Sequence, residues 1–201
     1  ALGFLALILT GTALLSMPFA SADGAPTALV SALFTATSAT TLTGLVTEDT
    51  GSHWSLAGQL IVLALIQVGG LGIMSITSLT GMLLTGRVKL RSRYATAAEG
   101  RPILDGGVRR TLVATLLLTF FFEGAVAVIL GIRFATVYGM APGRAAYEGV
   151  FHAISGFNNA GFGLRSDSLV SYNTDGWILI PLAGALMIGG LGYPVLSELV
   201  R

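Results

Sequence analysis

The sequence predicts an all-α integral membrane protein built from two copies of one unit: a spanning helix, a short loop that enters the membrane, and a second spanning helix. Of the 201 residues, 53% are hydrophobic and 10% are charged, whereas soluble domains carry roughly 25% charged residues. Lipid can solvate so apolar an exterior, but water cannot. The threonine-rich stretch 34–44 also recurs at 151–161. Four residues keep their identity 117 positions later: Phe34, Ala36, Ser38 and Gly44 return as Phe151, Ala153, Ser155 and Gly161.

Four apolar segments are predicted to cross the membrane. The second is uncharged over thirty residues, about 45 Å as a helix, so it must tilt, kink or protrude. The third holds a single charge, Glu123. The spanning segments are residues 2–20, 56–85, 111–132 and 177–197, and the segments 28–46 and 145–164 between them are too short and too polar to cross.

Charge placement predicts the orientation. Residues 87–110 hold seven basic and two acidic residues, so the positive-inside rule makes this segment cytoplasmic. A topology signal explains the cluster, and docking of a partner is the alternative. Both short segments then begin and end on the outer side as re-entrant loops. Irregular backbone at that depth is tolerated only when it is buried in protein or lines a water-filled cavity.

The predicted units are residues 1–86 and 111–201, joined by the basic linker 87–110. Each unit starts inside, so the repeats are parallel and related by rotation about the membrane normal. A glycine motif recurs 120 residues later within the second spanning segment of each unit. Close helix packing is its predicted role, with a hinge as the alternative. The glycines are Gly69, Gly70, Gly72, Gly189, Gly190 and Gly192.

The re-entrant segments have a chemistry suited to cations. Residues 28–39 have apolar positions at helical spacing without proline or glycine, which predicts a descending helix whose negative C-terminal end faces the membrane centre. Backbone carbonyls of the returning strand can replace an ion's hydration water, and Gly44 and Gly161 permit positive φ there. Neither loop contains an acidic residue, which favours small monovalent cations. A closed ring needs about four such loops, and this sequence supplies two.

Three stretches resemble the Trk/Ktr/HKT potassium transporters: Thr35 to Leu45, Gln67 to Met74 and Phe151 to Phe162. The resemblance covers essentially the whole sequence. It implies a pseudo-fourfold, potassium-channel-like fold and potassium uptake through a carbonyl-lined selectivity filter. Glycine rather than serine at position 44 is the pattern that is associated with potassium selectivity in the family that the sequence resembles. The implied filter residues are Thr41, Leu42, Thr43, Gly44, Asn158, Asn159, Ala160 and Gly161.

The resemblance is strongest to bacterial Trk/Ktr membrane subunits of the inner membrane. It implies a homodimer in the lipid bilayer that docks cytosolic, nucleotide-binding RCK subunits. No cofactor is expected in this chain, since the nucleotide belongs to the partner. The family's third and fourth repeats, with their gating loop and pore-blocking arginine, are missing, so we expect the sequence to be part of a longer protein.

Two alternative functions belong to other classes. A secondary transporter of a small solute predicts inverted repeats with charged or aromatic groups at helix breaks, whereas these repeats are parallel. A non-conducting assembly subunit does not explain why both loops end in glycine. No set of nucleophile, base and acid is apparent, so an enzyme is not predicted. The absence of cysteine excludes disulfides, and a net charge of +1 gives no general attraction to nucleic acid.

The isolated acidic, histidine and tryptophan residues are predicted to have structural roles. For Glu123, pairing with a polar group of a neighbouring helix is favoured over direct ion coordination. His53 and His152 lack the spacing of metal ligands, and His152 is expected on the surface of the second descending helix. Trp54 and Trp177 are predicted to be interfacial anchors.

Overall fold

The computed structural model describes the backbone of residues 2–93 and 105–199 and the side chains of 2–76 and 113–191. Every named element in these residues is helical, which confirms the all-α prediction. Two short 3-10 helices lie in the connections, at Pro18–Ala20 and Val170–Tyr172. The α-helices are α1 (Leu2–Leu15), α2 (Leu29–Thr41), α3 (Leu56–Arg93), α4 (Asp105–Thr136), α5 (Pro142–Phe157) and α6 (Gly176–Leu199).

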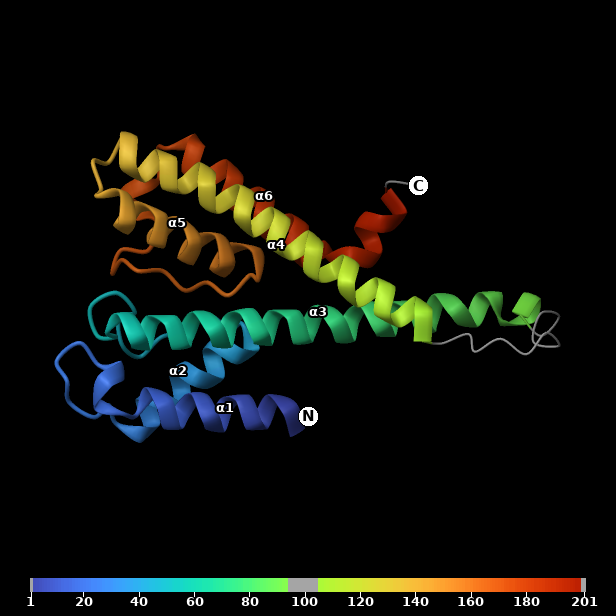
Figure 1. The fold of residues 1–201 in the computed structure, drawn as a ribbon, viewed down its shortest axis with the longest axis horizontal. Coiled ribbons are helices and arrows are strands. Elements are labelled where there is room, and N and C mark those ends of the chain that lie inside the picture. Colours follow the sequence, from blue (N-terminus) through green and yellow to red (C-terminus); the bar gives the residue numbers. More distant parts are fainter. Residues whose placement is uncertain (1, 94–104, 200–201) are drawn as a thin grey trace.

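The helices form two halves, α1–α3 and α4–α6, that pack side by side (Figure 1). In each half a helix runs toward one end of the molecule, a short helix turns back, and a final helix runs away from that end. The connections that precede and follow α2 reach this end of the molecule, and so do those that precede and follow α5. We call it the loop end. The short helix α5 stops partway along α3 and α4, and the chain then returns to the loop end as an extended segment.

The predicted continuous helix over residues 2–20 is wrong, because α1 ends at Leu15. Met17 is extended, with φ −79° and ψ 148°, and Pro18 follows it. Proline disfavours the helical conformation of the residue before it and has no N–H to donate. The 14 residues of α1 are about 21 Å long, shorter than a hydrocarbon core of roughly 30 Å.

Two helices are long and apolar enough to cross a membrane within the described side chains: Leu56–Ile76 of α3 and Val113–Thr136 of α4. The whole of α3 has 38 residues, about 57 Å, so it extends beyond a bilayer core. Both helices continue into the segment 87–110 that was predicted as a linker. Residues 94–104 of that linker lie outside the described residues.

Two buried clusters form the core, and they interlock the two halves. The second cluster is built mainly from α4–α6, around Leu130, Phe134 and Phe157. The first is built mainly from α1–α3, around Leu15 and Ile66. Four buried residues of the second half complete the first cluster, and all belong to α5 or the segment after it: Phe151, Ala160, Phe162 and Leu164.

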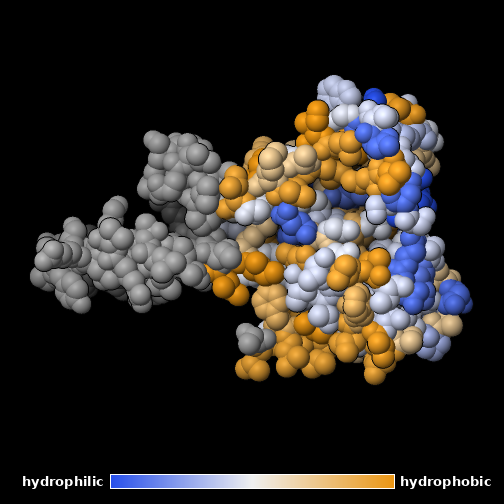
Figure 2. All heavy atoms as spheres, turned by 180° about the vertical axis from the view of Figure 1, so that it is seen from behind, coloured by the Kyte–Doolittle hydropathy of each residue, from blue (hydrophilic) through white to orange (hydrophobic). Residues whose placement is uncertain are grey.

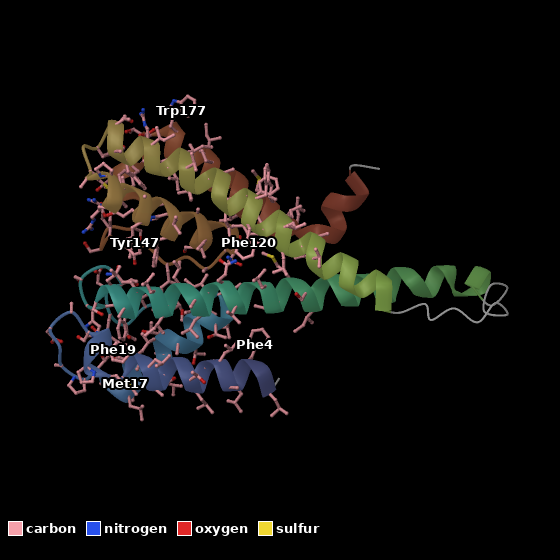
Figure 3. The ribbon with its side chains drawn as sticks, in the orientation of Figure 1. Phe4, Met17, Phe19, Phe120, Tyr147 and Trp177 are labelled. Atoms are coloured by element: carbon pink, nitrogen blue, oxygen red, sulfur yellow. The ribbon has the colours of Figure 1, made fainter. Side chains whose placement is uncertain are left out.

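Many large apolar side chains are exposed on the surface. Figure 2 shows hydrophobic side chains over most of one face, with hydrophilic side chains gathered at the loop end. Trp177 is 67% exposed there, as expected of an interfacial anchor, and it points away from the helices in Figure 3. The same prediction is wrong for Trp54, which is 1% exposed. Its ring packs edge-on against His53 and fills the first buried cluster.

Candidate functional site

The segment after α2 leaves the helix through a left-handed turn. Leu42 has φ 61° and ψ 36°, and its N–H donates to the carbonyl of Ser38. The N–H of Thr43 donates to the same carbonyl at 3.0 Å, and its hydroxyl donates to Ser38 Oγ at 2.9 Å. Gly44 follows with φ 74°. The two N–H groups satisfy the Ser38 carbonyl, which the end of a helix would otherwise leave free.

The segment after α5 repeats this geometry 117 residues later. Asn159 has φ 58° and Gly161 has φ 73°, matching Leu42 and Gly44. The N–H of Ala160 donates to the carbonyl of Ser155 at 2.8 Å, as Thr43 does to Ser38. The hydroxyl of Ser155 donates onward to the carbonyl of Phe162 at 2.6 Å. The two segments therefore share one backbone conformation, and we call them the first loop (residues 41–44) and the second loop (residues 158–161).

The two loops contact each other at their glycines. A Cβ atom added to Gly44 would lie 2.7 Å from the carbonyl oxygen of Ala160 and 3.2 Å from the Cα of Gly161. Within the loops, Asn158 and Ala160 are buried while Thr43, Asn159 and Gly161 are exposed. The structure thus brings the eight predicted filter residues from both halves into one region.

Glycines of α3 and α6 lie directly behind the loops. A Cβ at Gly69 would overlap the carbonyl oxygen of Thr40, and a Cβ at Gly189 would overlap that of Phe157. Thr40 and Phe157 are 117 residues apart and the two glycines 120 apart, so the contacts are equivalent. In each half, the last helix therefore approaches the end of the short helix closely enough to exclude any side chain.

The remaining motif glycines have looser surroundings, apart from Gly70, where a Cβ would overlap the side-chain oxygen of Asn158. A Cβ at Gly72 would lie 3.2 Å from the ring of Phe4, which points from α1 toward α3 in Figure 3. A Cβ at Gly190 would lie 3.7 Å from Asn159 Nδ2. The surroundings of Gly192 lie outside the described side chains.

The one acidic residue of the third apolar segment has a partner in the second loop. Glu123 on α4 is 4% exposed, and its Oε1 accepts a hydrogen bond from Asn158 Nδ2 at 2.9 Å. The predicted pairing of Glu123 with a polar group of a neighbouring helix is confirmed. The sequence did not indicate that this partner lies at the beginning of a loop.

Three arginines at the loop end form ion pairs with nearby carboxylates. Arg133 and Asp175 lie 2.8 Å apart, and the guanidinium lowers the pKa of that carboxyl below its usual value. Arg144 pairs with the buried Glu148 at 2.9 Å. Arg165 pairs with Asp167 at 3.2 Å. Three carboxylates at this end are therefore each paired with a nearby arginine.

The two histidines lie in separate polar surroundings. His53 lies 3.0 Å from Thr27 Oγ1 and 3.8 Å from Glu48. The expected surface position of His152 is wrong: it is 3% exposed, with Nδ1 2.8 Å from the carbonyl oxygen of Glu148. Among the described side chains, no group of three or more histidines, cysteines or carboxylates could hold a metal ion.

Comparison with known proteins places the chain beside cation transporters. The family model described as TrkH, cation transport protein, matches residues 4–200. The Ktr system potassium uptake protein B of Bacillus subtilis is 38% identical over 201 residues, covering 100% of this chain and 44% of the relative. The potassium/sodium uptake protein NtpJ of Enterococcus hirae is 36% identical over 200 residues, covering 100% and 44%. The Ktr system potassium uptake protein B of Vibrio alginolyticus is 36% identical over 201 residues, covering 100% and 43%.

The matches extend along the whole chain, but the chain spans less than half the length of these relatives. Their names describe cation transport and uptake, and none describes an enzyme.

Proposed function

Because the chain belongs to the TrkH family of cation transport proteins, we propose that it is part of a membrane subunit that takes up potassium through a filter lined by backbone carbonyls. It is a membrane protein and not an enzyme, in keeping with this family and with its two long apolar helices. Permeation through the filter is passive in this proposal.

The observation that carries the proposal is the pair of matched loops. Each half contributes one loop in which a left-handed residue and a left-handed glycine are separated by one residue, and the glycines Gly44 and Gly161 contact each other. Carbonyls on such a backbone can replace the hydration shell of a cation. The proposed lining consists of Thr41, Leu42, Thr43, Gly44, Asn158, Asn159, Ala160 and Gly161.

Two electrostatic features favour a monovalent cation. The helices α2 and α5 both end at the loops, and helix C-termini carry partial negative charge that stabilises cations. The loops themselves contain no carboxylate, which a site for divalent cations would need. Two of the relatives are named as potassium uptake proteins, which agrees with a site for a monovalent cation.

We further propose that residues 1–86 and 111–201 are two parallel helix–pore loop–helix repeats of a pseudo-fourfold fold, with 87–110 on the cytoplasmic side of the cell membrane. The equivalent contacts of Gly69 and Gly189 support the repeat. Other parts of the full-length protein would supply the remaining loops of the ring. The proposals of a homodimer and of RCK-type regulatory subunits follow from the resemblance described above. No cofactor is proposed for this chain.

Complementation tests the function. The complete protein, produced with its regulatory subunit in a cell lacking its own potassium uptake systems, should restore growth at low potassium and take up labelled potassium or rubidium. Labelled sodium measured in parallel gives the selectivity, which matters because one relative is named for both ions. Absence of uptake by protein that reaches the membrane would reject the proposal, and uptake of a neutral solute instead would favour a secondary transporter.

A further inference from the structure

We propose that Glu123 is a positioning residue for the second loop and that its hydrogen bond to Asn158 helps to set ion selectivity. This inference rests on the proposed function, because it assigns Glu123 a role in the same filter. It concerns a side chain behind the loop that touches no ion.

The bond between the two residues is buried. Glu123 Oε1 accepts from Asn158 Nδ2 at 2.9 Å, and Asn158 is 2% exposed. The same Nδ2 also donates to the carbonyl of Ile154, at 2.9 Å, within α5. Both protons of the amide group are thus used, one toward α4 and one toward its own helix.

The third helix around Asn158 is α3. Gly70 leaves room for Asn158 Oδ1, since a Cβ at that position would overlap this oxygen. Gln67, one turn earlier on α3, lies close to the Glu123 carboxylate, although its amide makes no hydrogen bond of ordinary geometry. The first residue of the second loop is therefore held between α3, α4 and α5.

The first loop lacks such a bond within the part of the chain whose side chains are described. Thr41 is the equivalent of Asn158, and it makes the equivalent local bond: its hydroxyl donates to the carbonyl of Thr37 at 2.8 Å. Thr41 is exposed, and the structure gives it no hydrogen bond to another described helix. Among the described side chains, a buried acidic residue bonds to the second loop and none bonds to the first, so loss of Glu123 should disturb one loop and leave the other in place.

The physical reason for an effect on selectivity is the low dielectric around the bond. Removal of the acceptor leaves a buried N–H of Asn158 without a partner. Asn158 would then reorient, and the carbonyls that follow it would move. Selection between cations depends on the arrangement of such carbonyls.

A scaffold role for Glu123 makes a different prediction. If the carboxylate only joins α4 to α5, its loss should reduce the amount of folded protein and lower the uptake of both ions by the same factor. A positioning role instead changes the ratio of potassium to sodium uptake per folded molecule. The ratio is therefore the measurement that separates the two.

The experiment compares variants of the complete protein after purification and reconstitution into liposomes, with potassium and sodium uptake measured per folded transporter. Glu123→Leu keeps the bulk but removes the acceptor, and should lower the potassium-to-sodium ratio on the order of tenfold, about 1.4 kcal/mol. Glu123→Gln retains an acceptor oxygen and should stay within about twofold of the wild type.

Thr119→Val is the matched control. Thr119 is one turn earlier on α4, is fully buried, and its hydroxyl makes no hydrogen bond, so this nearly isosteric change should leave the ratio unaltered. Should Glu123→Leu fail to fold, Asn158→Ala removes the same bond from the other side while keeping the backbone carbonyl, and should lower the ratio in the same way.

A wild-type ratio in Glu123→Leu, equal losses for both ions, or equal damage in Glu123→Gln and Glu123→Leu would each overturn this inference alone. A wild-type protein without potassium uptake would overturn the proposed function, and this role with it.

Discussion

Gly44 and Gly161 meet where the two loops contact each other. A methyl group on Gly44 would lie 3.2 Å from the Cα of Gly161, and one on Gly161 would lie 3.3 Å from the Cα of Gly44. Both residues have left-handed backbone conformations, with φ 74° and 73°. A side chain at either position is therefore disfavoured by backbone strain and by the neighbouring loop.

The first prediction concerns Gly44→Ala and Gly44→Ser. Either side chain would be pressed against the carbonyl of Ala160, at 2.7 Å for the Cβ. We expect the loops to separate, the potassium-to-sodium uptake ratio to fall, and folding to be destabilised by roughly 1–3 kcal/mol. Ion uptake in the complementation assay and thermal unfolding in detergent measure the two effects.

Gly24→Ala is the matched control for backbone strain. Gly24 has φ 73°, but a Cβ there would meet nothing within 4 Å. Its substitution should cost stability through φ alone and leave selectivity unchanged. If growth and selectivity are the same in wild type, Gly44→Ala and Gly44→Ser, the filter assignment is wrong.

The helices could be predicted because their signals are local. Apolar runs, charge placement and the repeat around Gly44 and Gly161 need no knowledge of tertiary contacts. The end of α1 also had a local signal, Pro18, which the continuous apolar composition concealed. Burial of Trp54 and His152 could not be predicted, because each depends on residues distant in sequence. Both positions were assigned from residue type, which describes an average environment.

The candidate site also has features that the sequence predicted and features that only the structure shows. Repetition of the glycine motif predicted close packing, yet the carbonyls that oppose Gly69 and Gly189 appear only in the structure. Asn159 is a residue type that tolerates positive φ, whereas nothing marks Leu42 as left-handed. The partner of Glu123 was also hidden, since any polar residue of another helix satisfied the sequence pattern.

The second prediction compares two glycines of α6. Gly189→Ala would place a methyl group onto the carbonyl oxygen of Phe157, so α6 or α5 must shift. We expect a loss of about 1–3 kcal/mol in the free energy of unfolding. Gly184→Ala on the same helix meets nothing within 4 Å and should instead gain up to about 1 kcal/mol from helix propensity. Thermal unfolding of both variants in detergent measures these changes in stability. Equal shifts of the unfolding temperature in the two variants would contradict close packing at Gly189.

The third prediction is a pH dependence at the loop end. Arg133 lowers the pKa of Asp175, and the hydroxyl of Tyr138 donates to the same oxygen at 3.1 Å. A carboxyl whose pKa is lower in the folded than in the unfolded state adds stability above its unfolded value, near 3.8. That stability is lost as the pH falls through the folded value. Thermal unfolding of the wild type should therefore shift to lower temperature below about pH 4.

Asp175→Asn tests this assignment. Asparagine can still accept the hydrogen bond that Asp175 Oδ1 receives from the N–H of Trp177 at 3.0 Å, so the start of α6 is retained. The variant should unfold at a lower temperature than the wild type at pH 7 and show a weaker pH dependence between pH 5 and 3. An unchanged acid dependence would place its origin in another carboxylate.

The fourth prediction concerns the hydrogen bond that joins the two halves at the loop end. Tyr147 of α5 points toward α3 (Figure 3), and its hydroxyl donates to Gln59 Oε1 at 2.8 Å. Gln59 Nε2 in turn donates to the carbonyl of Trp54 at 2.9 Å. Tyr147→Phe should lower the free energy of unfolding by about 0.5–1.5 kcal/mol, because it removes only the hydroxyl. In a double-mutant cycle, Tyr147→Phe should cost much less in the Gln59→Leu background, where the acceptor is absent. Additive costs would mean that the two side chains do not interact, and that this hydrogen bond does not help to hold the halves together.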